Sequence, residues 1–326
     1  SADGRTGIHA VEWTPDMAPR AVLVLSHGVS EHILRYEPLA AYLTERGFAV
    51  AGHDHLGHGG SIRTKADYGY FAEPDGNRAV LADLHAMTVR TKELYPGVPY
   101  FLLGHSMGSF YARQYLCEYG HELDGAIIMG TGFQPKALVA TARALCRVLA
   151  VFFGWEHRSK LVANLSFLGY NRGLEGRTPQ DWLNRDQAEV DKYRADERCM
   201  FTFTLNAYYS MFTGILRLYD PAVLAGIPKD LPLLFLAGDA DPVGERTAGV
   251  RRAIQSLREH RVKILPRRPP RAAGGDEQSR GVCGHRRLAR KTTASLNPKL
   301  LHRTDDVGAF SSGLRKSTPP GGPKAA

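Results

Sequence analysis

Residues 98–109 read Val98-Pro-Tyr-Phe-Leu-Leu-Gly-His-Ser-Met-Gly-Ser109, and they join two kinds of periodicity. The apolar run from Tyr100 to Leu103 is typical of a short strand that is buried on both faces. Phe110 to Tyr119 follows a helical pattern, and we expect Gly120 to end that helix. The chain therefore passes from a buried strand to a helix through one tight turn.

That turn has the form G-x-S-x-G, with Ser106 at its centre. Strand, G-x-S-x-G and helix together are the context of a nucleophile elbow. The two glycines would let the backbone turn without a Cβ clash, and the helix N-terminus would direct free N–H groups toward a developing oxyanion. The alternative is an ordinary Gly-Ser turn, because a chain with 34 glycines can contain the motif by chance. The flanking strand and helix favour the nucleophile.

The composition is that of a globular protein, because 43% of its 326 residues are hydrophobic. This length suits one large α/β domain with an insertion or two smaller domains. No apolar run is long enough to predict a membrane span. The polar start, Ser1 to Gly7, lacks the apolar core of a signal peptide and, without Met, is interpreted as trimmed or partial. Scattered cysteines without disulfide or metal spacing predict a reduced, cytoplasmic setting: Cys117, Cys146, Cys199 and Cys283.

The net charge of +9 is unevenly distributed. Residues 261–326 hold 15 of the 42 Lys and Arg residues but only 4 of the 33 Asp and Glu residues. The first 260 residues are therefore nearly neutral, with 27 basic and 29 acidic side chains. The basic segment differs in kind from the rest of the chain.

Apolar runs alternate with helical patterns through the first 130 residues. This rhythm implies a mostly parallel, doubly wound sheet with right-handed crossovers. We predict strands over 7–13, 21–26, 48–52, 100–103, 124–130, 231–238 and 261–265, and helices over 36–46, 77–95, 110–119, 138–153 and 247–259.

Histidines gather in His53-Asp-His-Leu-Gly-His-Gly-Gly60, after a predicted strand. A metal site is one interpretation of this loop. A structural loop beside the nucleophile is favoured, because the glycines make the loop tight and no distant set of ligands accompanies it. We therefore expect no metal. We interpret the histidines of the sheet-edge loops as structural: His27, His32, His53, His55, His58 and His105.

Between about Phe133 and Lys229 the strand–helix rhythm stops, and helical, aromatic-rich sequence replaces it. We expect a helical insertion that forms a lid over the site. An apolar lid favours an apolar substrate chain and transient contact with a membrane surface. The alternative is that these aromatic side chains only pack the lid onto the core.

Two carboxylates follow the next strand, in Gly238-Asp-Ala-Asp-Pro-Val243. Strand carboxyl ends lie on the active edge of such a sheet, so Asp239 or Asp241 is placed to orient a histidine. The alternative is an Asp-Pro turn, and we expect one of the two aspartates to serve only that turn.

Four stretches, in this order and context, resemble the α/β-hydrolases of the monoacylglycerol lipase and lysophospholipase group, also classed with serine aminopeptidases. They are Ser26-His-Gly-Val-Ser-Glu-His32, His53-Asp-His-Leu-Gly-His-Gly59, Gly104-His-Ser-Met-Gly108 and Gly238-Asp-Ala-Asp-Pro-Val243, within roughly residues 4–265. The resemblance implies an α/β-hydrolase fold with a helical lid. It also implies a serine hydrolase that cleaves monoacylglycerol- or lysophospholipid-like esters as small-molecule substrates without a cofactor.

By the same resemblance, Ser106 is the nucleophile and Asp241 the acid of a triad, and the backbone N–H groups of Val29 and Met107 form the oxyanion hole. We divide the chain into a hydrolase core of residues 1–132 and 230–265, a lid of residues 133–229 and a basic, disordered tail of residues 266–326. Peptide or thioester hydrolysis on the same fold is an alternative chemistry.

The chain departs from this family where the histidine of the triad is expected, after the last strand. Residues 266–273 read Pro-Arg-Arg-Pro-Pro-Arg-Ala-Ala, with no histidine, and the prolines disfavour a final strand and helix. Codons exist for which skipping one base makes this stretch read Pro-Gly-Gly-Arg-His-Glu-Leu-Leu, which restores the family's turn and its histidine. We therefore hypothesise a frameshift near residues 260–265. The final strand and helix would then be missing, and the chain would be a catalytically impaired or unstable product.

The tail offers two histidines, His285 and His302, either of which could in principle supply the base. Its composition is typical of disorder, because it has no hydrophobic periodicity and ends in a Pro- and Gly-rich segment. A basic arm for nucleic acid or anionic lipid is the functional alternative. No aromatic or motif pattern supports that arm, so we expect no nucleic-acid partner.

Overall fold

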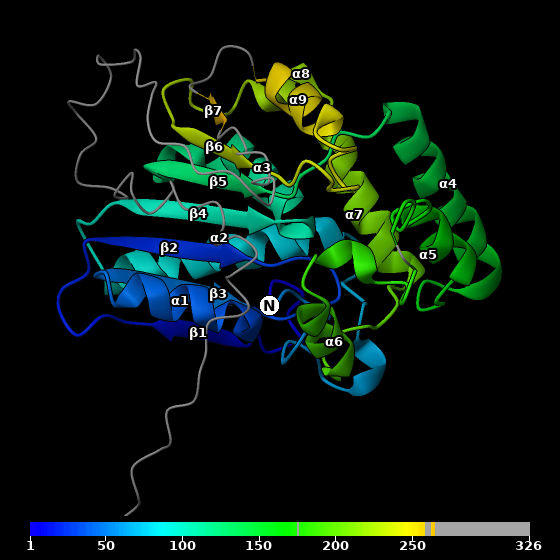
Figure 1. Ribbon diagram of the computed structural model, residues 1–326, viewed down its shortest axis with the longest axis horizontal. Helices are drawn as coiled ribbons and strands as arrows, with labels where there is room; N and C mark the ends of the chain where they lie inside the picture. Colours follow the sequence, from blue (N-terminus) through cyan, green and yellow to red (C-terminus); the bar gives the residue numbers. More distant parts are fainter. Residues whose placement is uncertain (175, 258–261, 265–326) are drawn as a thin grey trace, which may run out of the picture.

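The computed structural model describes residues 1–174, 176–257 and 262–264, and its centre is a seven-stranded sheet (Figure 1). The strand order is β1-β3-β2-β4-β5-β6-β7; β1 is antiparallel to β3, and every other pair is parallel. The expected mostly parallel sheet is thus confirmed. The strands are β1 (Ala10–Trp13), β2 (Ala21–Ser26), β3 (Phe48–His53), β4 (Tyr100–His105), β5 (Gly125–Met129), β6 (Leu233–Leu236) and β7 (Val262–Ile264).

The helices fall between the strands, as the sequence pattern predicts. They are α1 (Glu37–Thr44), α2 (Gly76–Leu94), α3 (Met107–Tyr119), α4 (Lys136–Phe153), α5 (Lys160–Ser166), α6 (Gln187–Ala195), α7 (Leu205–Arg217), α8 (Pro221–Leu224) and α9 (Ala248–Gln255). One detail differs from expectation. Gly120 keeps right-handed torsion angles and leads into a short 3-10 turn, so α3 ends without a left-handed glycine cap.

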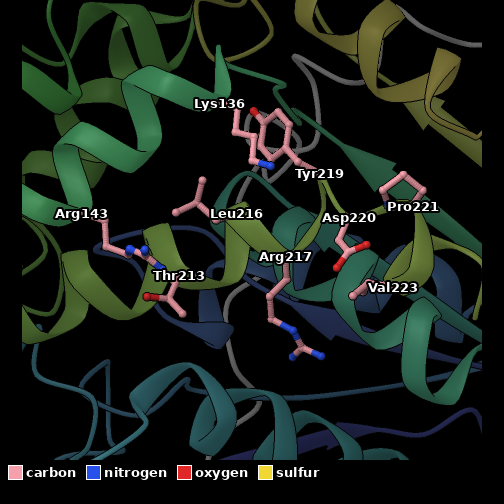
Figure 2. Close-up of a pocket in the computed structure, with 9 residues that line it drawn as sticks. All are labelled: Lys136, Arg143, Thr213, Leu216, Arg217, Tyr219, Asp220, Pro221 and Val223. Carbon is pink, nitrogen blue, oxygen red and sulfur yellow. The ribbon is translucent and has the colours of Figure 1, made fainter.

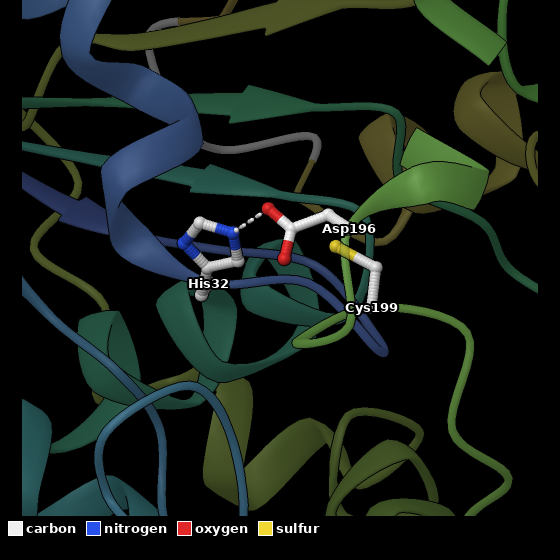
Figure 3. A group of neighbouring side chains, drawn as sticks. All are labelled: His32, Asp196 and Cys199. Atoms are coloured by element: carbon white, nitrogen blue, oxygen red, sulfur yellow. Dashed lines mark hydrogen bonds and ion pairs between the residues drawn. The ribbon is translucent and has the colours of Figure 1, made fainter. Parts of the chain in front are cut away.

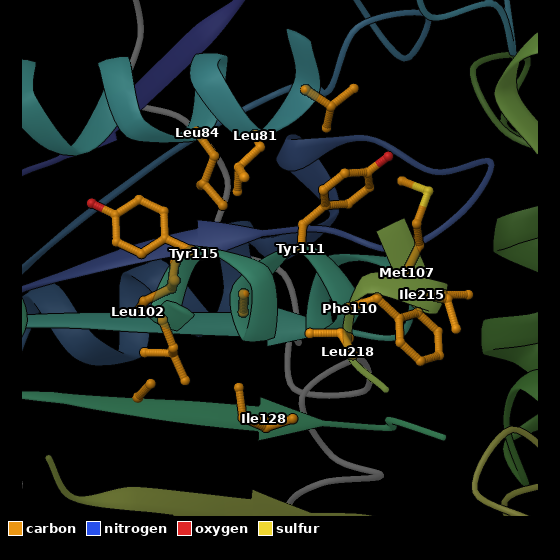
Figure 4. Close-up of a cluster of buried hydrophobic side chains, with 14 of the residues drawn as sticks. Leu81, Leu84, Leu102, Met107, Phe110, Tyr111, Tyr115, Ile128, Ile215 and Leu218 are labelled. Carbon is orange, nitrogen blue, oxygen red and sulfur yellow. The ribbon is translucent and has the colours of Figure 1, made fainter. Parts of the chain in front are cut away.

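Alternate strand residues pack into two separate cores. On one face, Leu102 and Ile128 meet the side chains of α2 and α3, including Leu84 and Tyr115 (Figure 4). On the other face, Leu103 and its neighbours in β2, β3 and β5 meet the segment that leads into α1. Burial on both faces explains the continuous apolar runs of β2, β3 and β4.

The two faces are covered unequally at β5 and β6. Ile128 and Phe235 point into the α2–α3 core and are at most 1% exposed. Met129, Leu234 and Leu236 point to the α1 side and are only partly buried. The helical residues of that second core all come from residues 33–43, as far as the described chain extends. This end of the sheet therefore has one well-covered face and one poorly covered face.

Residues 130–232 separate β5 from β6 and carry helices α4 to α8. α4 packs along α7, and α7 packs against α2 and α3. The helices α4, α5 and α6 lie beyond the carboxyl ends of the parallel strands, where the arrowheads point (Figure 1). Among the described residues, no helix is long and apolar enough to cross a bilayer. The predicted domain boundaries stay predictions, and the predicted tail, residues 266–326, lies outside the described residues.

Candidate active site

Ser106 stands alone between the end of β4 and the start of α3. Its φ of +52° is unusual for a residue with a side chain, and it marks the sharp strand-to-helix turn. The flanking glycines do not have positive φ angles; they are required by close contacts. A Cβ on Gly108 would lie 2.0 Å from the carbonyl oxygen of Ser26, and one on Gly104 would lie 2.4 Å from that of Gly108. The glycines thus let α3 approach the sheet, while Ser106 itself adopts the strained torsion angle.

The backbone on both sides of Ser106 is hydrogen-bonded. Its N–H donates to the carbonyl oxygen of Met129 on β5 at 2.9 Å. Its carbonyl oxygen accepts from the N–H and the hydroxyl of Ser109, at 2.9 and 2.6 Å. Its side chain is partly exposed, and no hydrogen bond from its Oγ to another described residue is present. The hydroxyl is therefore presented on a fixed backbone and is accessible.

Residues 27–32, the β2 loop, pass directly beside Ser106. A Cβ on Gly28 would lie 3.3 Å from the Cβ of Ser106, so the backbone of the loop runs along the serine. The N–H groups of Val29 and Met107 donate to no described residue, and Met107 begins α3. Both amides are thus available in the neighbourhood of Ser106, as an oxyanion hole requires.

Ser30 fixes the conformation of this loop with a φ of +51°. Its N–H donates to Nε2 of His58 at 3.3 Å, and its hydroxyl donates to the carbonyl oxygen of Phe201 at 2.7 Å. The hydroxyl of Tyr193 donates to the carbonyl oxygen of Ser30 at 3.0 Å. Because Tyr193 and Phe201 belong to the segment between β5 and β6, that segment holds the β2 loop in place.

Glu31 is a buried carboxylate that organises the same loop. It accepts hydrogen bonds from the N–H of Gly28 at 2.5 Å, the hydroxyl of Tyr36 at 2.9 Å and Nε of Arg35 at 3.2 Å, and Nδ1 of His105 lies 3.3 Å away. Burial alone would raise the pKa of this carboxyl, but the hydrogen bond and charge of His105, together with Arg35, hold it well below its usual range. Glu31 is therefore ionised and fully engaged. The sequence shows no signal of this network, which depends on three separate elements.

The loop histidines pack as a neutral structural cluster around the β2 loop. Nε2 of His27 accepts the N–H of His55 at 2.9 Å, so its Nδ1 carries the proton and donates to the carbonyl oxygen of Gly28. Burial lowers the pKa of His53 and of His58 to about 3. Rings of neighbouring histidines lie 4.4 to 6.3 Å apart between centroids. These contacts favour the structural interpretation of the His53–Gly60 loop.

Residues 237–247, the β6 loop, contain both candidate acids, in different surroundings. Asp239 is half exposed and pairs with Nη2 of Arg185 at 3.2 Å. Asp241 is more enclosed: its Oδ1 accepts the N–H of Val243 at 2.9 Å. Its Oδ2 would lie 3.6 Å from a Cβ on Gly130, a glycine that also adjoins the ring of His105. Gly130 directly follows Met129, the acceptor of the Ser106 amide, so Asp241 lies on the same sheet edge as the serine.

The environment of Asp241 is partly apolar. Burial raises the pKa of its carboxyl above the usual value, and the Val243 amide and the nearby charge of His105 offset part of that change. The backbone beyond it is irregular, because Glu245, Arg246 and Thr247 all have positive φ. Hydrogen bonds hold the loop, including those from the N–H of Arg246 to the carbonyl oxygen of Asp241 at 2.9 Å and from Nε2 of Gln134 to that of Val243 at 3.1 Å.

The described residues do not bring a base to Ser106. No described histidine has a ring nitrogen within hydrogen-bonding distance of the Ser106 hydroxyl, and Nδ1 of the adjacent His105 is engaged with Tyr36 at 2.8 Å. The two tail histidines, His285 and His302, lie outside the described residues. Ser106, the amides of Val29 and Met107, and Asp241 thus lie on one edge of the sheet, and no described histidine binds the Ser106 hydroxyl.

Two open surface pockets lie elsewhere on the molecule. One, of about 380 Å³, lies between α4, α7 and α8 and is lined by Lys136, Arg143 and Arg217 among others (Figure 2). The other, of about 450 Å³, lies beside Tyr68 and Phe201. Neither is lined by Ser106 or Asp241, so the chemistry argued above does not depend on them.

Comparison with known proteins gives a family match. Residues 17–267 match the family described as serine aminopeptidase, S33. A monoglyceride lipase of Rattus norvegicus is 32% identical over 247 residues, which are 70% of this chain and 68% of that protein. A monoglyceride lipase homolog of Monkeypox virus is 31% identical over 192 residues, 58% of this chain and 60% of the viral protein. The chain thus spans between three fifths and about two thirds of the length of these relatives.

Solved structures agree with this match. The structure of a thermostable carboxyl esterase from Bacillus coagulans, in complex with glycerol, superposes with a TM-score of 0.73. It is 28% identical in sequence, and the match covers 81% of this chain and 86% of that one. The fold expected from the four sequence stretches is therefore confirmed.

Proposed function

The chain belongs to the serine aminopeptidase S33 family of α/β-hydrolases, and from this premise we propose that it is a serine ester hydrolase of monoacylglycerol- or lysophospholipid-like esters. The observation that carries the proposal is the strained turn at Ser106, with the free amides of Val29 and Met107 beside it. The names of its relatives support an ester with a glycerol-type head group.

In the proposed reaction, the Ser106 hydroxyl attacks the acyl carbon as a base removes its proton. The amides of Val29 and Met107 stabilise the tetrahedral oxyanion, each by about 3 kcal/mol. Asp241 orients the base and stabilises its cation. The alcohol leaves with the proton, and water then hydrolyses the acyl-enzyme.

The helical segment between β5 and β6 supplies the apolar surface for such a substrate. Its exposed side chains include Val148, Val151, Phe152 and Phe153 on α4 and Leu161 on α5. We propose that this segment, residues 133–229, acts as a lid that accepts the acyl chain and makes transient contact with a membrane surface. The described cysteines are free thiols, which supports the proposal of a reduced, cytoplasmic setting.

A second candidate follows because no described histidine reaches Ser106: a hydrolase fold that binds the ester but does not cleave it. A triad enzyme without its base loses on the order of 10⁶ in kcat. We propose that a frameshift near residues 260–265 removed the histidine. Resequencing the source DNA tests this proposal: a shifted frame that encodes Gly-Gly-x-His supports it, and an intact frame for the present tail refutes it.

A fluorophosphonate probe tests the activated serine. We expect one label per chain, at Ser106, that is lost in Ser106→Ala and kept in Ser166→Ala, a lid serine far from the elbow in sequence. A wild-type chain that unfolds cooperatively, and is therefore folded, but takes no label would support the second candidate, the catalytically impaired product.

Substrate assays follow if the serine is labelled. Fresh protein is assayed on monoacylglycerols, lysophospholipids and aminoacyl amides, because the name of the family includes a peptidase. Faster cleavage of the amides would refute the ester assignment.

A further inference from the structure

His32, Asp196 and Cys199 meet where the β2 loop touches the segment between β5 and β6 (Figure 3). Nε2 of His32 lies 2.8 Å from Oδ2 of Asp196, and the donor atoms of all three side chains lie within 4.8 Å of one another. His32 and Cys199 are only 2% and 4% exposed. An imidazole, a carboxylate and a thiol are thus brought together where little of their surface is exposed to solvent.

One tight turn places two of the three side chains. The chain leaves α6 at Ala195, and the N–H of Cys199 donates to the carbonyl oxygen of Asp196 at 3.0 Å. Met200 follows with a φ of +65°, which ends the turn. The Ser30 bonds to Tyr193 and Phe201 hold this turn against the loop that carries His32. The backbone around the cluster is therefore fixed from both sides.

Each side chain of the cluster is held differently. Nδ1 of His32 is buried and has no hydrogen-bond partner among the described residues, so the ring is fixed only through its Nε2 bond to Asp196. The case for a ligand rests on the convergence of imidazole, carboxylate and thiol donors within 4.8 Å.

The set of donors selects the class of that ligand. Imidazole nitrogen and thiolate sulfur suit zinc and neighbouring divalent metals, whereas magnesium and calcium require oxygen ligands. Bonds of about 2.0–2.3 Å to a tetrahedral ion place ligand atoms about 3.4–3.7 Å apart. The three donors reach such distances through shifts of about 1 Å.

The charges are also compatible with a divalent ion. The thiolate of Cys199 and the carboxylate of Asp196 would neutralise it. Arg198 binds both oxygens of Asp196, through Nε to Oδ1 at 3.1 Å and through Nη2 to Oδ2 at 3.0 Å. Its side chain is 44% exposed, so it can move toward solvent when an ion takes its place on Oδ2. Arg35 is already paired with Glu31. No uncompensated buried cation would face the ion.

We propose that His32, Asp196 and Cys199 form a binding site for a divalent transition metal of the zinc class, with water as the fourth ligand. Binding releases the thiol proton to solvent and moves the imidazole proton from Nε2 to Nδ1. The exchange replaces the hydrogen bond between Nε2 and Asp196 by bonds to the ion, and it leaves the proton on Nδ1, which faces no described acceptor. The bound ion fastens the β5–β6 segment to the β2 loop, three residues from Val29. This site goes beyond the proposed hydrolase function and does not depend on it.

Cobalt(II) titration of the full, reduced chain tests the site without any use of activity. We expect one Co²⁺ per chain, a thiolate-to-cobalt charge-transfer band in the near ultraviolet, and displacement of the band by Zn²⁺. Cys199→Ser should abolish the band. Asp196→Asn should weaken Co²⁺ binding by more than about 100-fold, because the loss of a direct ligand exceeds the roughly 10–100-fold cost of altering a partner that only orients a ligand.

Two matched controls separate this thiol from the others. Cys146→Ser, in α4, should keep the band, and so should Cys283→Ser, which removes the thiol of the Cys283-Gly-His285 sequence. A band that survives Cys199→Ser, or that disappears with Cys283→Ser, overturns the proposal. If Cys199→Ser does not fold, alkylation of wild-type protein followed by mass mapping decides: Zn²⁺ should protect Cys199 selectively, and equal labelling with and without Zn²⁺ refutes the site.

Discussion

In the β2 loop, Ser30 and Glu31 are held by several hydrogen bonds in and near the core, whereas the β6 loop carries exposed charged side chains. Glu31 accepts bonds from three elements, and Ser30 is bonded on its amide, hydroxyl and carbonyl. In the β6 loop, the charged Asp239, Glu245 and Arg246 are exposed. The loop with the proposed oxyanion-hole amide is thus anchored in the core, and the loop with the proposed acid lies nearer the surface.

The largest expected effect comes from the acid. Asp241→Asn should lower kcat/KM, or the rate of fluorophosphonate labelling, by about 10⁴-fold, as removal of a triad carboxylate does elsewhere. Asp239→Asn should change either rate by less than about twofold, because its side chain pairs with Arg185 at the surface. Rate measurements on both variants check this. Equally small effects of the two substitutions on the rate would contradict the proposed role of Asp241.

A substitution beneath the β2 loop comes next. Gly108→Ala should destabilise the fold by about 3 kcal/mol, because its Cβ would meet the carbonyl oxygen of Ser26. Gly7→Ala is the control, since nothing lies within 4 Å of its added Cβ. Urea unfolding of both variants measures the difference. A stable Gly108→Ala variant would mean that α3 does not approach the sheet as closely as described.

Matched charge removals compare the two loops directly. Glu31→Gln should lower the free energy of unfolding by about 2–3 kcal/mol. The buried carboxylate accepts several hydrogen bonds, and an amide in its place would leave some of these donors without an acceptor. Glu245→Gln, in the β6 loop, should cost less than about 1 kcal/mol, because its pair with Arg252 is exposed. Denaturant titrations measure both values. Similar losses would contradict the contrast between the loops.

Acid should destabilise the β2 side through its histidines. The pKa of His53 is near 6.5 in unfolded chains and about 3 in the fold, so between these values only the unfolded state holds the proton. The free energy of unfolding therefore falls as the pH drops from about 6.5 toward 3, by about 1.4 kcal/mol per pH unit for this group, and stays level above 6.5.

His53→Leu is the test of that slope. Both ring nitrogens of His53 are buried without hydrogen-bond partners, so leucine removes an ionisable group and no hydrogen bond. Below pH 6.5, the unfolding free energy of the variant should change with pH by about 1.4 kcal/mol per unit less than that of the wild type. At pH 7.5 the two slopes should be equal. An unchanged acid slope would mean that His53 is not buried as described.

The sequence predicts some parts of this molecule well because their physics is local. The apolar runs that become β2, β3 and β4 are buried on both faces, and G-x-S-x-G between strand and helix locates Ser106. Periodicity alone is less reliable at helix ends, since Leu94 fits the apolar stripe of α2 but is 48% exposed. The residue pattern alone left Asp239 and Asp241 open, and the family resemblance selected Asp241; the pairing of Asp239 with the distant Arg185 is seen only in the structure.

The β2-loop network and the proposed metal site could not be predicted in the same way. Glu31 lies in the Ser26–His32 stretch, but that stretch does not reveal its partners, which come from β4, the β2 loop and η1 (Ile33–Tyr36). His32 and Asp196 are 164 residues apart, and only the packing of the lid segment onto the loop joins them. Our expectation of no metal rested on spacing along the chain, which says nothing about such a pair.

The hydrogen bonds that join Ser30 to Tyr193 and Phe201 also limit which parts of the β5–β6 segment can be exchanged. They tie the later part of the β5–β6 segment to the sheet edge that carries Ser106, and the earlier part is joined to the later part because α4 packs along α7. A chimera that exchanges residues 136–168 would therefore have to keep the surface of α4 that contacts α7. A graft that also replaces residues 193–201 would remove the partners that hold Ser30.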